Sequence, residues 1–324
     1  MTARAPETHT LFALYHTMLM ARAIERRLWV MSRLEEVRAS FKGTGFEAVQ
    51  AAAAAALRPG FDWVVPCPLD LTLCLAMGMS PLDVMLAVFG RAADPSSAGR
   101  QAPGTFGAKA GRIVMTSAAA GRHIVQAAGI AYASKVSGRE EVTLVCTDLR
   151  GTYAGDWHEG ISFAGVHALP LICLVEDHAA GSRPIPRHTD APVARAQGYG
   201  LASEAIDGGD LAASSAALSR AVERARSKGG ATLIHAQVVE LSSIAAEGGM
   251  LPPEQLEALA RQDPIDRLRR RLLGAGVLDD SADDEVQRDC AGAVEAAVAE
   301  ARLSPSPEGP RALDNVFSRE DRPG

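Results

Sequence analysis

The stretch that decides the fold is residues 142–175, VTLVCTDLRGTYAGDWHEGISFAGVHALPLICLV. It begins with one apolar run, Val142 to Cys146, and ends with another, Leu171 to Val175. Neither run alternates with polar residues, which is typical of strands buried on both faces of a parallel sheet. Between them, Trp157 to His167 has the length and composition of a crossover helix. This order of strand, helix and strand predicts an α/β fold.

Further segments extend this pattern toward both ends of the chain. Downstream, Ala212 to Arg226 predicts a helix and Thr232 to Ala236 predicts another apolar strand. Upstream, hydrophobic spacing and capping residues predict four helices, over residues 10–38, over 47–57, from Ser80 onward with Pro81 in the first turn, and over 124–135. We therefore predict a doubly wound, mainly parallel sheet between about Phe41 and Val239, with an N-terminal helix before it.

The chain is expected to divide near residue 248. A stretch that contains Gly and Pro, Gly248 to Pro253, predicts a linker, and the charged segment Pro264 to Leu303 predicts a helical tail. We expect an α/β domain with its N-terminal helix over residues 1–247, and the linker with the C-terminal helical tail over residues 248–324.

Composition excludes several classes of protein. The 324 residues include 33 Lys and Arg and 39 Asp and Glu, for a net charge of −6, and only 5% are aromatic. A dedicated nucleic-acid binder needs a basic surface and stacking platforms, so we expect no nucleic-acid partner. The longest stretch without acidic or basic residues, Gly160 to Val175, is too short to cross a membrane, and Met1 to Thr10 lacks a secretory signal pattern. We predict a cytoplasmic protein without a membrane segment.

The five cysteines are scattered and odd in number, with no Cys-x-x-Cys pair. We interpret them as reduced, mostly buried thiols without a disulfide or metal role. They are Cys67, Cys74, Cys146, Cys173 and Cys290.

Ligands of open α/β sheets bind at the carboxyl ends of the strands, so the residues after Cys146 and Val175 are the informative ones. The first of these segments contains Gly151-Thr152-x-x-Gly155-Asp156-x-His158-Glu159-Gly160-x-x-Phe163-Ala164, then Leu169-Pro170 and a strand. Matching segments elsewhere are Gly45 to Val49, Ala55 to Gly60, Gly90-Arg91, Gly99 to Pro103, Gln126 to Lys135, Gly198 to Gly200, Asp207 to Asp210 and Asp263 to Leu268. In this order they resemble the thiamine-diphosphate-binding alpha subunit of 2-oxo acid dehydrogenase complexes, most closely the branched-chain type.

This resemblance implies a thiamine-diphosphate-binding fold. In that family the cofactor is anchored through Mg²⁺ by a Gly-Asp-Gly turn after one strand and by an Asn after the next, because Mg²⁺ prefers hard oxygen ligands. Here Asp148-Leu149-Arg150 stands where Gly-Asp-Gly belongs, so Leu149 replaces the metal-binding carboxylate. A one-residue insertion could return Asp148 to the ligand position, but both glycines would still be absent.

Three other parts of the implied site also depart from the family. Asp177-His178 stands for Asn-Asn, Pro68-Leu69 for a Tyr-Arg pair that holds the diphosphate, and Ile244 for an active-site histidine. A diphosphate without these partners would face a large desolvation cost, so we expect a degenerate site with no cofactor and no metal. The family positions that remain as candidates for cofactor binding are Asp148, Gly151, Asp177, His178 and Arg122.

Basic residues near the same pocket leave a further alternative open. They could hold a different anion, or they could be loop and interface charges: Arg100, Lys109, Arg122, His123 and Arg183.

Two other motifs carry little chemistry. His158-Glu159 lacks the second histidine of a zinc-protease helix, so we expect Asp156, His158 and Glu159 to begin and cap the crossover helix. Gly160 to Ala164 imitates a nucleophile elbow, but Ser162 falls inside the predicted helix rather than at a strand-to-helix turn. We therefore expect no catalytic serine.

Two functions are compatible with these residues. The first is a non-catalytic or repurposed alpha-type subunit that pairs with a beta-type subunit, as α₂β₂ by the resemblance; the small-residue helices 50–57 and 124–133 suit such an interface or the core. The second is active, thiamine-diphosphate-dependent oxidative decarboxylation of a branched-chain 2-oxo acid. That reaction would need Asp148 and Asp177 as the metal-binding carboxylates, with Arg122 or Arg150 at the diphosphate. A variant site near Asp148, Asp177 and His178 could also prefer a softer ion such as Zn²⁺ or Mn²⁺.

Overall fold

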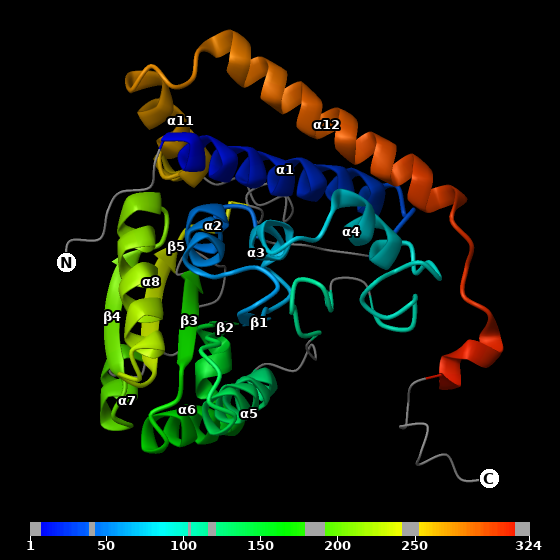
Figure 1. The fold of residues 1–324 in the computed structure, drawn as a ribbon. Helices are drawn as coiled ribbons and strands as arrows, with labels where there is room; N and C mark the ends of the chain where they lie inside the picture. The colour runs from blue at the N-terminus through cyan, green and yellow to red at the C-terminus, as the bar shows by residue number, and fades with distance from the viewer. Residues whose placement is uncertain are drawn as a thin grey trace.

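The computed structural model describes residues 8–38, 43–102, 105–115, 121–178, 192–241 and 253–314. Five parallel strands form one sheet in the order β1-β2-β3-β5-β4 (Figure 1). Their bounds are β1 Trp63–Val65, β2 Thr143–Asp148, β3 Leu171–His178, β4 Ala202–Asp207 and β5 Thr232–Val238. The predicted parallel α/β fold is confirmed.

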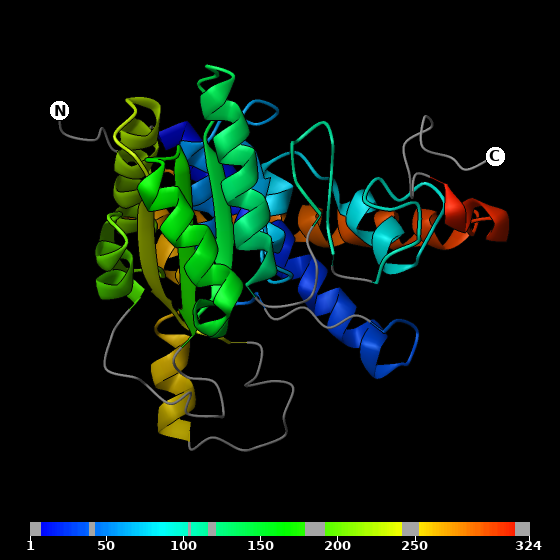
Figure 2. The ribbon, with the colours of Figure 1, turned by 90° about the horizontal axis from the view of Figure 1, so that it is seen from below.

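Helices cover both faces of the sheet, so the sheet is doubly wound as predicted (Figures 1 and 2). One face packs against α2 Glu47–Ala56, α3 Leu71–Ala76 and α8 Leu211–Arg226, with α1 Thr8–Arg33 outside them. The other face packs against α5 Arg122–Val136, α6 Gly155–Val166 and α7 Pro192–Gly198. Side chains of alternate strand residues therefore enter two separate hydrophobic clusters.

Two of the five strands are not predicted by the hydrophobic pattern. Strand β1 has only three residues, and β4 is an edge strand with polar positions that remain partly exposed. Val64 and Val65 of β1 are buried in opposite clusters, but three residues are too few to form a recognisable apolar run, and the polar positions of β4 do not form one.

Most predicted helices are present, with small shifts at their ends. The Ala-rich helix α2 is buried from Glu47 to Ala54 and packs against α8 and α3, so it belongs to the core of this chain. Helix α4, Pro81–Val88, begins with the predicted cap, because the Ser80 hydroxyl accepts from the Asp83 N–H and the Asp83 carboxylate accepts from the Ser80 N–H.

The start of α6 differs from the prediction. Its N-cap residue is Ala154, which makes no side-chain cap hydrogen bond, and Asp156 lies in the first turn. The expectation that Asp156, His158 and Glu159 cap this helix is therefore wrong, although all three belong to its first turns. Ser162 lies inside α6 as predicted, away from any strand-to-helix turn.

The predicted C-terminal tail is two helices rather than one continuous segment. Helix α11, Pro264–Gly274, ends before a turn in which Gly276 has φ 67°, and α12, Asp280–Leu303, follows it. Helix α10, Pro253–Ala260, precedes them and lies beyond the ends of the strands, and η2, Gly309–Leu313, follows. Helix α12 packs along α1, where the Tyr15 hydroxyl donates to Asp283 Oδ1 at 2.6 Å (Figure 1).

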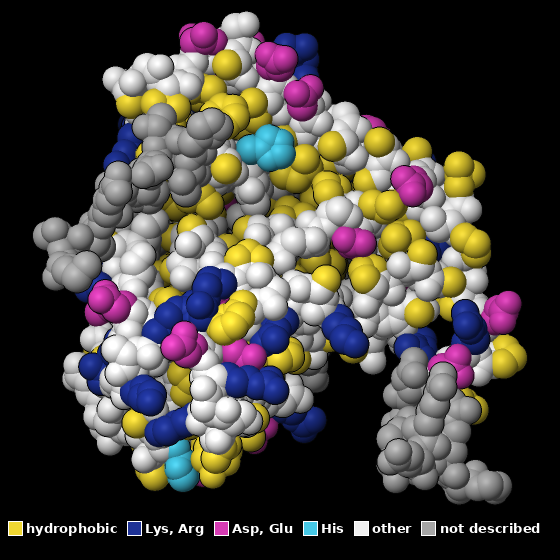
Figure 3. All heavy atoms as spheres, in the orientation of Figure 1, with side chains coloured by type: hydrophobic (Ala, Val, Ile, Leu, Met, Phe, Trp, Pro, Cys, Tyr) yellow, Lys and Arg dark blue, Asp and Glu magenta, His cyan; other side chains and the backbone are white. Residues whose placement is uncertain are grey.

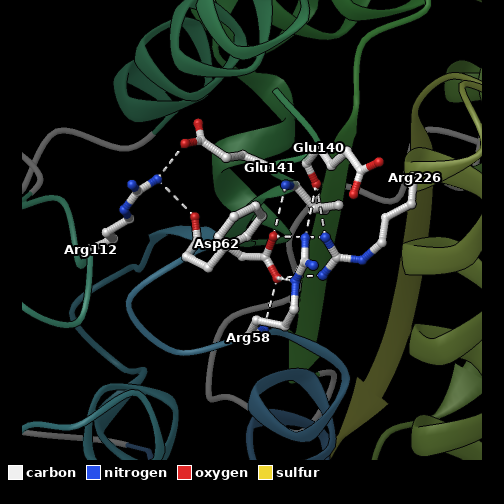
Figure 4. Close-up of polar contacts among 8 residues, drawn as sticks. Arg58, Asp62, Arg112, Glu140, Glu141 and Arg226 are labelled. Atoms are coloured by element: carbon white, nitrogen blue, oxygen red, sulfur yellow. Dashed lines mark hydrogen bonds and ion pairs between the residues drawn. The ribbon is translucent and has the colours of Figure 1, made fainter. Parts of the chain in front are cut away.

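The edge of the sheet where β1 and β2 begin holds two buried carboxylates (Figure 4). Asp62 accepts hydrogen bonds from both terminal nitrogens of Arg226, at 3.1 and 2.5 Å, and from the backbone of Arg58 and Val142. The Glu141 carboxylate accepts from Arg112 at 2.6 Å, from Ser134 at 2.7 Å and from the Trp63 indole at 3.0 Å. Arginines on the surface thus compensate both buried charges.

The surface seen in the orientation of Figure 1 carries charges of both signs. Lys and Arg side chains interleave with Asp and Glu over the part that contains the sheet, while hydrophobic and uncharged side chains dominate near α1 and α12 (Figure 3). None of the described helices combines the length and hydrophobicity needed to span a membrane. All five cysteines are buried, as predicted, and are free of disulfides.

Candidate functional site

The carboxyl ends of β2 and β3 bring together the polar residues that the sequence singles out. The strand register sets Asp148 opposite Glu176. Because side chains alternate along a strand, His178 shares a face with Glu176, whereas Asp177 points to the opposite face. The apolar neighbours agree, since Leu174 lies in the cluster under α2 and Val175 in the cluster under α5 and α6.

Asp148 closes the turn that follows β2. Its Oδ1 accepts a hydrogen bond from the Gly151 N–H at 2.8 Å, and the chain continues into η1, Arg150–Tyr153. A Cβ on Gly151 would stand 2.1 Å from Thr147 Oγ1, so this tight turn requires glycine. Leu149 is buried beside them. Asp148 and Gly151 therefore stabilise the turn itself.

His178, at the end of β3, faces a carboxylate from the neighbouring strand end. Its Nδ1 lies 3.2 Å from Glu240 Oε2, and its ring packs against the Phe46 ring at 5.8 Å between centroids. Glu240 raises the pKa of His178 above its ordinary value, and the Asp148 carboxylate acts in the same direction against Arg150. The pair favours a positively charged imidazole at this position.

Asp177 forms a hydrogen bond with a second histidine on the other face of the sheet. The His235 ring hydrogen-bonds through Nε2 to Asp177 Oδ2 at 3.0 Å, and both side chains are nearly buried. The structure therefore separates Asp177 from Asp148, although the sequence placed them together.

The predicted basic residues do not gather at this edge. Arg122 begins α5 with an exposed side chain whose Nε is 4.0 Å from Asp156 Oδ2. Arg100 donates to the Asp314 carbonyl at 2.5 Å, and the buried His123 contacts the Cys146 carbonyl at 2.6 Å. Arg183 and Ile244 lie outside the described residues. Among the described residues, the anion site proposed from these side chains is therefore not assembled.

A buried polar cluster beneath the edge is the feature that the sequence did not indicate. The Gln50 amide donates to Glu176 Oε1 at 3.1 Å and to Asp70 Oδ1 at 3.3 Å, and the Cys67 thiol lies 3.2 Å from the same Asp70 oxygen. The one signal available in the sequence is Glu176 itself, a carboxylate that directly extends an apolar strand.

Comparison with known proteins places the chain in a family. Residues 15–309 match the family described as the dehydrogenase E1 component. The chain belongs to this family. It is 34% identical over 312 residues to the 2-oxoisovalerate dehydrogenase subunit alpha of Bacillus subtilis, with 94% of each chain covered.

Two further relatives of this E1 component chain are also alpha subunits. The 3-methyl-2-oxobutanoate dehydrogenase subunit alpha of Mycobacterium tuberculosis is 30% identical over 283 residues, which cover 86% of this chain and 74% of the relative. The pyruvate dehydrogenase E1 component subunit alpha of Staphylococcus aureus is 26% identical over 298 residues, which cover 90% and 78%. The predicted family is confirmed, with branched-chain-type relatives among its members.

For a member of this E1 family, thiamine diphosphate held through Mg²⁺ is the implied cofactor. The described side chains do not fit that group. Asp148 and Asp177 face opposite sides of the sheet, and His178 offers an imidazole already paired with a carboxylate where the resemblance expects an amide oxygen.

Proposed function

We propose that the chain is an alpha-type E1 subunit that does not hold Mg²⁺-thiamine diphosphate and acts as a structural or regulatory partner. The observation that carries this proposal is the contact of His178 with Glu240. His178 stands where the resemblance expects the metal-binding Asn, and here it forms an ion pair within the chain. Asp148 supports the same conclusion, since its oxygen caps the Gly151 turn.

Electrostatics also argues against a diphosphate at this edge. Its negative charge would approach the carboxylates of Asp148 and Glu240, and a buried charge without a partner costs several kcal/mol. Leu69 stands where the resemblance expects an arginine, and its backbone carbonyl accepts from Gln50. Arg150 is a described cation whose charge acts on His178, and it lowers the pKa of the imidazole.

The proposed partner is a beta-type subunit of the same family, in a cytoplasmic α₂β₂ assembly. The relatives over most of the chain length are named as alpha subunits, which supports a retained partner. Two helices with small residues were candidates for the contact. Helix α2 is buried in the core of this chain, so α5 is the better candidate for the contact with the partner. Val125 and Tyr132 are exposed on the outer side of α5.

An active enzyme is the alternative function. It is favoured by the 34% identity to a 2-oxoisovalerate dehydrogenase alpha subunit over nearly the whole of both chains. In this case the chain would take part in oxidative decarboxylation of a branched-chain 2-oxo acid. The His178 pair would then have to open, because the resemblance expects a metal ligand at that position.

Isothermal titration of thiamine diphosphate with excess Mg²⁺, into the chain purified with its beta-type partner, tests the proposal. We expect no binding while the complex stays intact on a sizing column. Binding at micromolar concentrations or tighter would overturn the proposal and favour the active enzyme.

Restoring the implied ligands provides a second arm of this test. The double variant Leu149→Asp, His178→Asn supplies the carboxylate and the amide that the resemblance expects. We expect it to gain measurable heat of binding. His167→Asn, a histidine substitution after the C-terminal end of α6 and remote from this edge, is the matched control and should gain none.

A further inference from the structure

The buried cluster beneath the sheet edge contains three side chains that can ligate a metal ion. Cys67 and Asp70 lie between β1 and α3, and Glu176 lies in β3, so two separate parts of the chain meet here. They are 8%, 1% and 0% exposed, respectively. The sulfur atom and one oxygen of each carboxylate all lie within 4.8 Å of one another.

The spacing of these atoms suits a tetrahedral ion. Cys67 Sγ is 3.2 Å from Asp70 Oδ1 and 3.9 Å from Glu176 Oε2. With Zn–S near 2.3 Å and Zn–O near 2.0 Å, tetrahedral geometry separates sulfur and oxygen by about 3.5 Å. The two observed distances bracket this value, so small side-chain shifts would bring both oxygens and the sulfur into coordination.

A second thiol lies in the same environment. Cys146, in β2, is fully buried and pairs in register with Leu174, two residues before Glu176, so its side chain lies on the same face of the sheet as Glu176. Two thiols with two carboxylates form a donor set that a divalent transition metal accepts.

The charge balance of the cluster also favours a cation. The donors to its carboxylates are the Gln50 amide, the Cys67 thiol and the Cys67 backbone N–H, and no described Lys or Arg hydrogen-bonds to Asp70 or Glu176. Burial of two carboxylates without a cation is costly, so the cluster must hold protons or a metal ion. A divalent ion would replace the protons of the thiol and the carboxyl pair, which leave to solvent.

We propose that Cys67, Asp70 and Glu176 form a binding site for a divalent transition-metal ion, with Zn²⁺ the expected ion and Cys146, on the same face of the sheet, the candidate fourth ligand. The site is structural: it would fasten the segment between β1 and α3 to β3. It differs from the Mg²⁺ site implied by the family, because it uses neither Asp148 nor His178. The inference does not depend on the proposed function, and it departs from the interpretation of the scattered cysteines as metal-free.

Cobalt substitution tests this site by a direct spectroscopic signature. The full-length chain is freed of metal with a chelator and titrated with Co²⁺, which occupies zinc sites and reports thiolate ligation through a sulfur-to-cobalt charge-transfer band. We expect one equivalent of Co²⁺ to produce this band together with the intense visible bands of tetrahedral cobalt, and equimolar Zn²⁺ to abolish both.

Variants then assign the ligands. Cys67→Ser should remove or strongly reduce the charge-transfer band, and Asp70→Asn should weaken Co²⁺ binding at least tenfold, each in protein shown to be folded by circular dichroism. Cys173→Ser is the matched control. Cys173 is a buried thiol in β3, the strand that contains Glu176, but its side chain enters the hydrophobic cluster on the other face of the sheet. The control should keep the band.

Three outcomes would overturn the site. They are a folded wild-type chain without the band, a band that survives both Cys67→Ser and Asp70→Asn, and a band lost in Cys173→Ser. Titration of thiamine diphosphate is a separate measurement, so failure of the metal site and failure of the proposed function can be told apart.

Discussion

The two ends of the parallel sheet bury carboxylates in opposite ways. Before β1 and β2, Asp62 and Glu141 each receive an arginine, and both charges are compensated at the surface (Figure 4). Toward the carboxyl ends of the strands, Asp70 and Glu176 receive hydrogen bonds from the Gln50 amide, the Cys67 thiol and the Cys67 backbone N–H, and from no described Lys or Arg. A buried acid with an arginine stays ionised, whereas one without a cation must keep its proton or take up a metal ion.

The direction of the pKa shifts follows the same division. The hydrogen bonds from Arg112, Ser134 and Trp63 outweigh burial and lower the pKa of Glu141 to about 2. Burial raises the pKa of Glu176 well above its ordinary range and raises that of Glu25 to about 7. Glu25 belongs to the second region, because it accepts from Gly43 and Thr44, and the Thr44 carbonyl accepts from Leu241 after β5.

The largest expected effect comes from removing a compensated charge. Asp62→Asn leaves Arg226 without its partner and should lower the free energy of unfolding by about 3–5 kcal/mol. Asp70→Asn, measured in chelator-treated protein, should cost less than about 2 kcal/mol, because the amide retains a hydrogen-bond acceptor and no arginine is left unpaired. Urea unfolding measures both, and equal losses would contradict the contrast between the two ends.

Glu25→Gln should have the next largest effect and depends on pH. The raised pKa means that the folded state holds the proton more tightly than the unfolded state. Wild-type stability relative to the variant is therefore highest below pH 4.5 and falls by up to about 3 kcal/mol as the pH rises to 7, with no further loss above. Urea unfolding of both proteins from pH 4 to 8 tests this, and a flat difference would be evidence against it.

Glu141→Gln should show the reverse pH dependence with a smaller effect. Its lowered pKa stabilises the folded chain above pH 4.5, and this contribution is lost as the pH falls toward 2. We expect the variant to be about 1–3 kcal/mol less stable at pH 7, the range for hydrogen bonds to a charged group. The difference from wild type should shrink in acid. Thermal unfolding at pH 7 and pH 3 provides the comparison, and a difference that grows in acid would be inconsistent with an ionised Glu141.

Arg122→Ala should have the smallest effect. The side chain is exposed and its only described ion pair spans 4.0 Å, so stability should change by less than about 0.5 kcal/mol. A loss above 1 kcal/mol in urea unfolding would mean that Arg122 has a partner beyond this pair. Arg226→Ala, at the opposite end of the sheet, is the contrasting variant and should destabilise strongly.

The central strands of the sheet could be predicted because burial on both faces gives each of them a continuous apolar sequence. The apolar runs of β2, β3 and β5 report burial on both faces. Strand β1 is too short to show a pattern, and β4 is polar because one side of it has no neighbouring strand. The break between α11 and α12 is set by Gly276, a signal present in the sequence but hidden by the charged residues around it.

The site could be predicted only in part. The sequence located the carboxyl ends of β2 and β3 correctly, but the pairing of Asp148 with Gly151 and of Asp177 with His235 depends on register and strand alternation. The Cys67 cluster joins positions more than 100 residues apart, with Cys67 and Glu176 separated by 109 in sequence. Such proximity is a property of the packed fold, and local patterns carry no trace of it.

The packing of α12 along α1 has a consequence for the synthesis of the chain. Tyr15 and Asp283, which meet in a buried hydrogen bond, are separated by 268 positions. At about 5–20 residues per second, the ribosome needs roughly 13–54 s to make the second partner after the first. During that time α12 does not yet cover the apolar side of α1. Chaperones can therefore bind the apolar side of α1 while the rest of the chain is synthesised. Premature termination before α12 would leave that side exposed permanently.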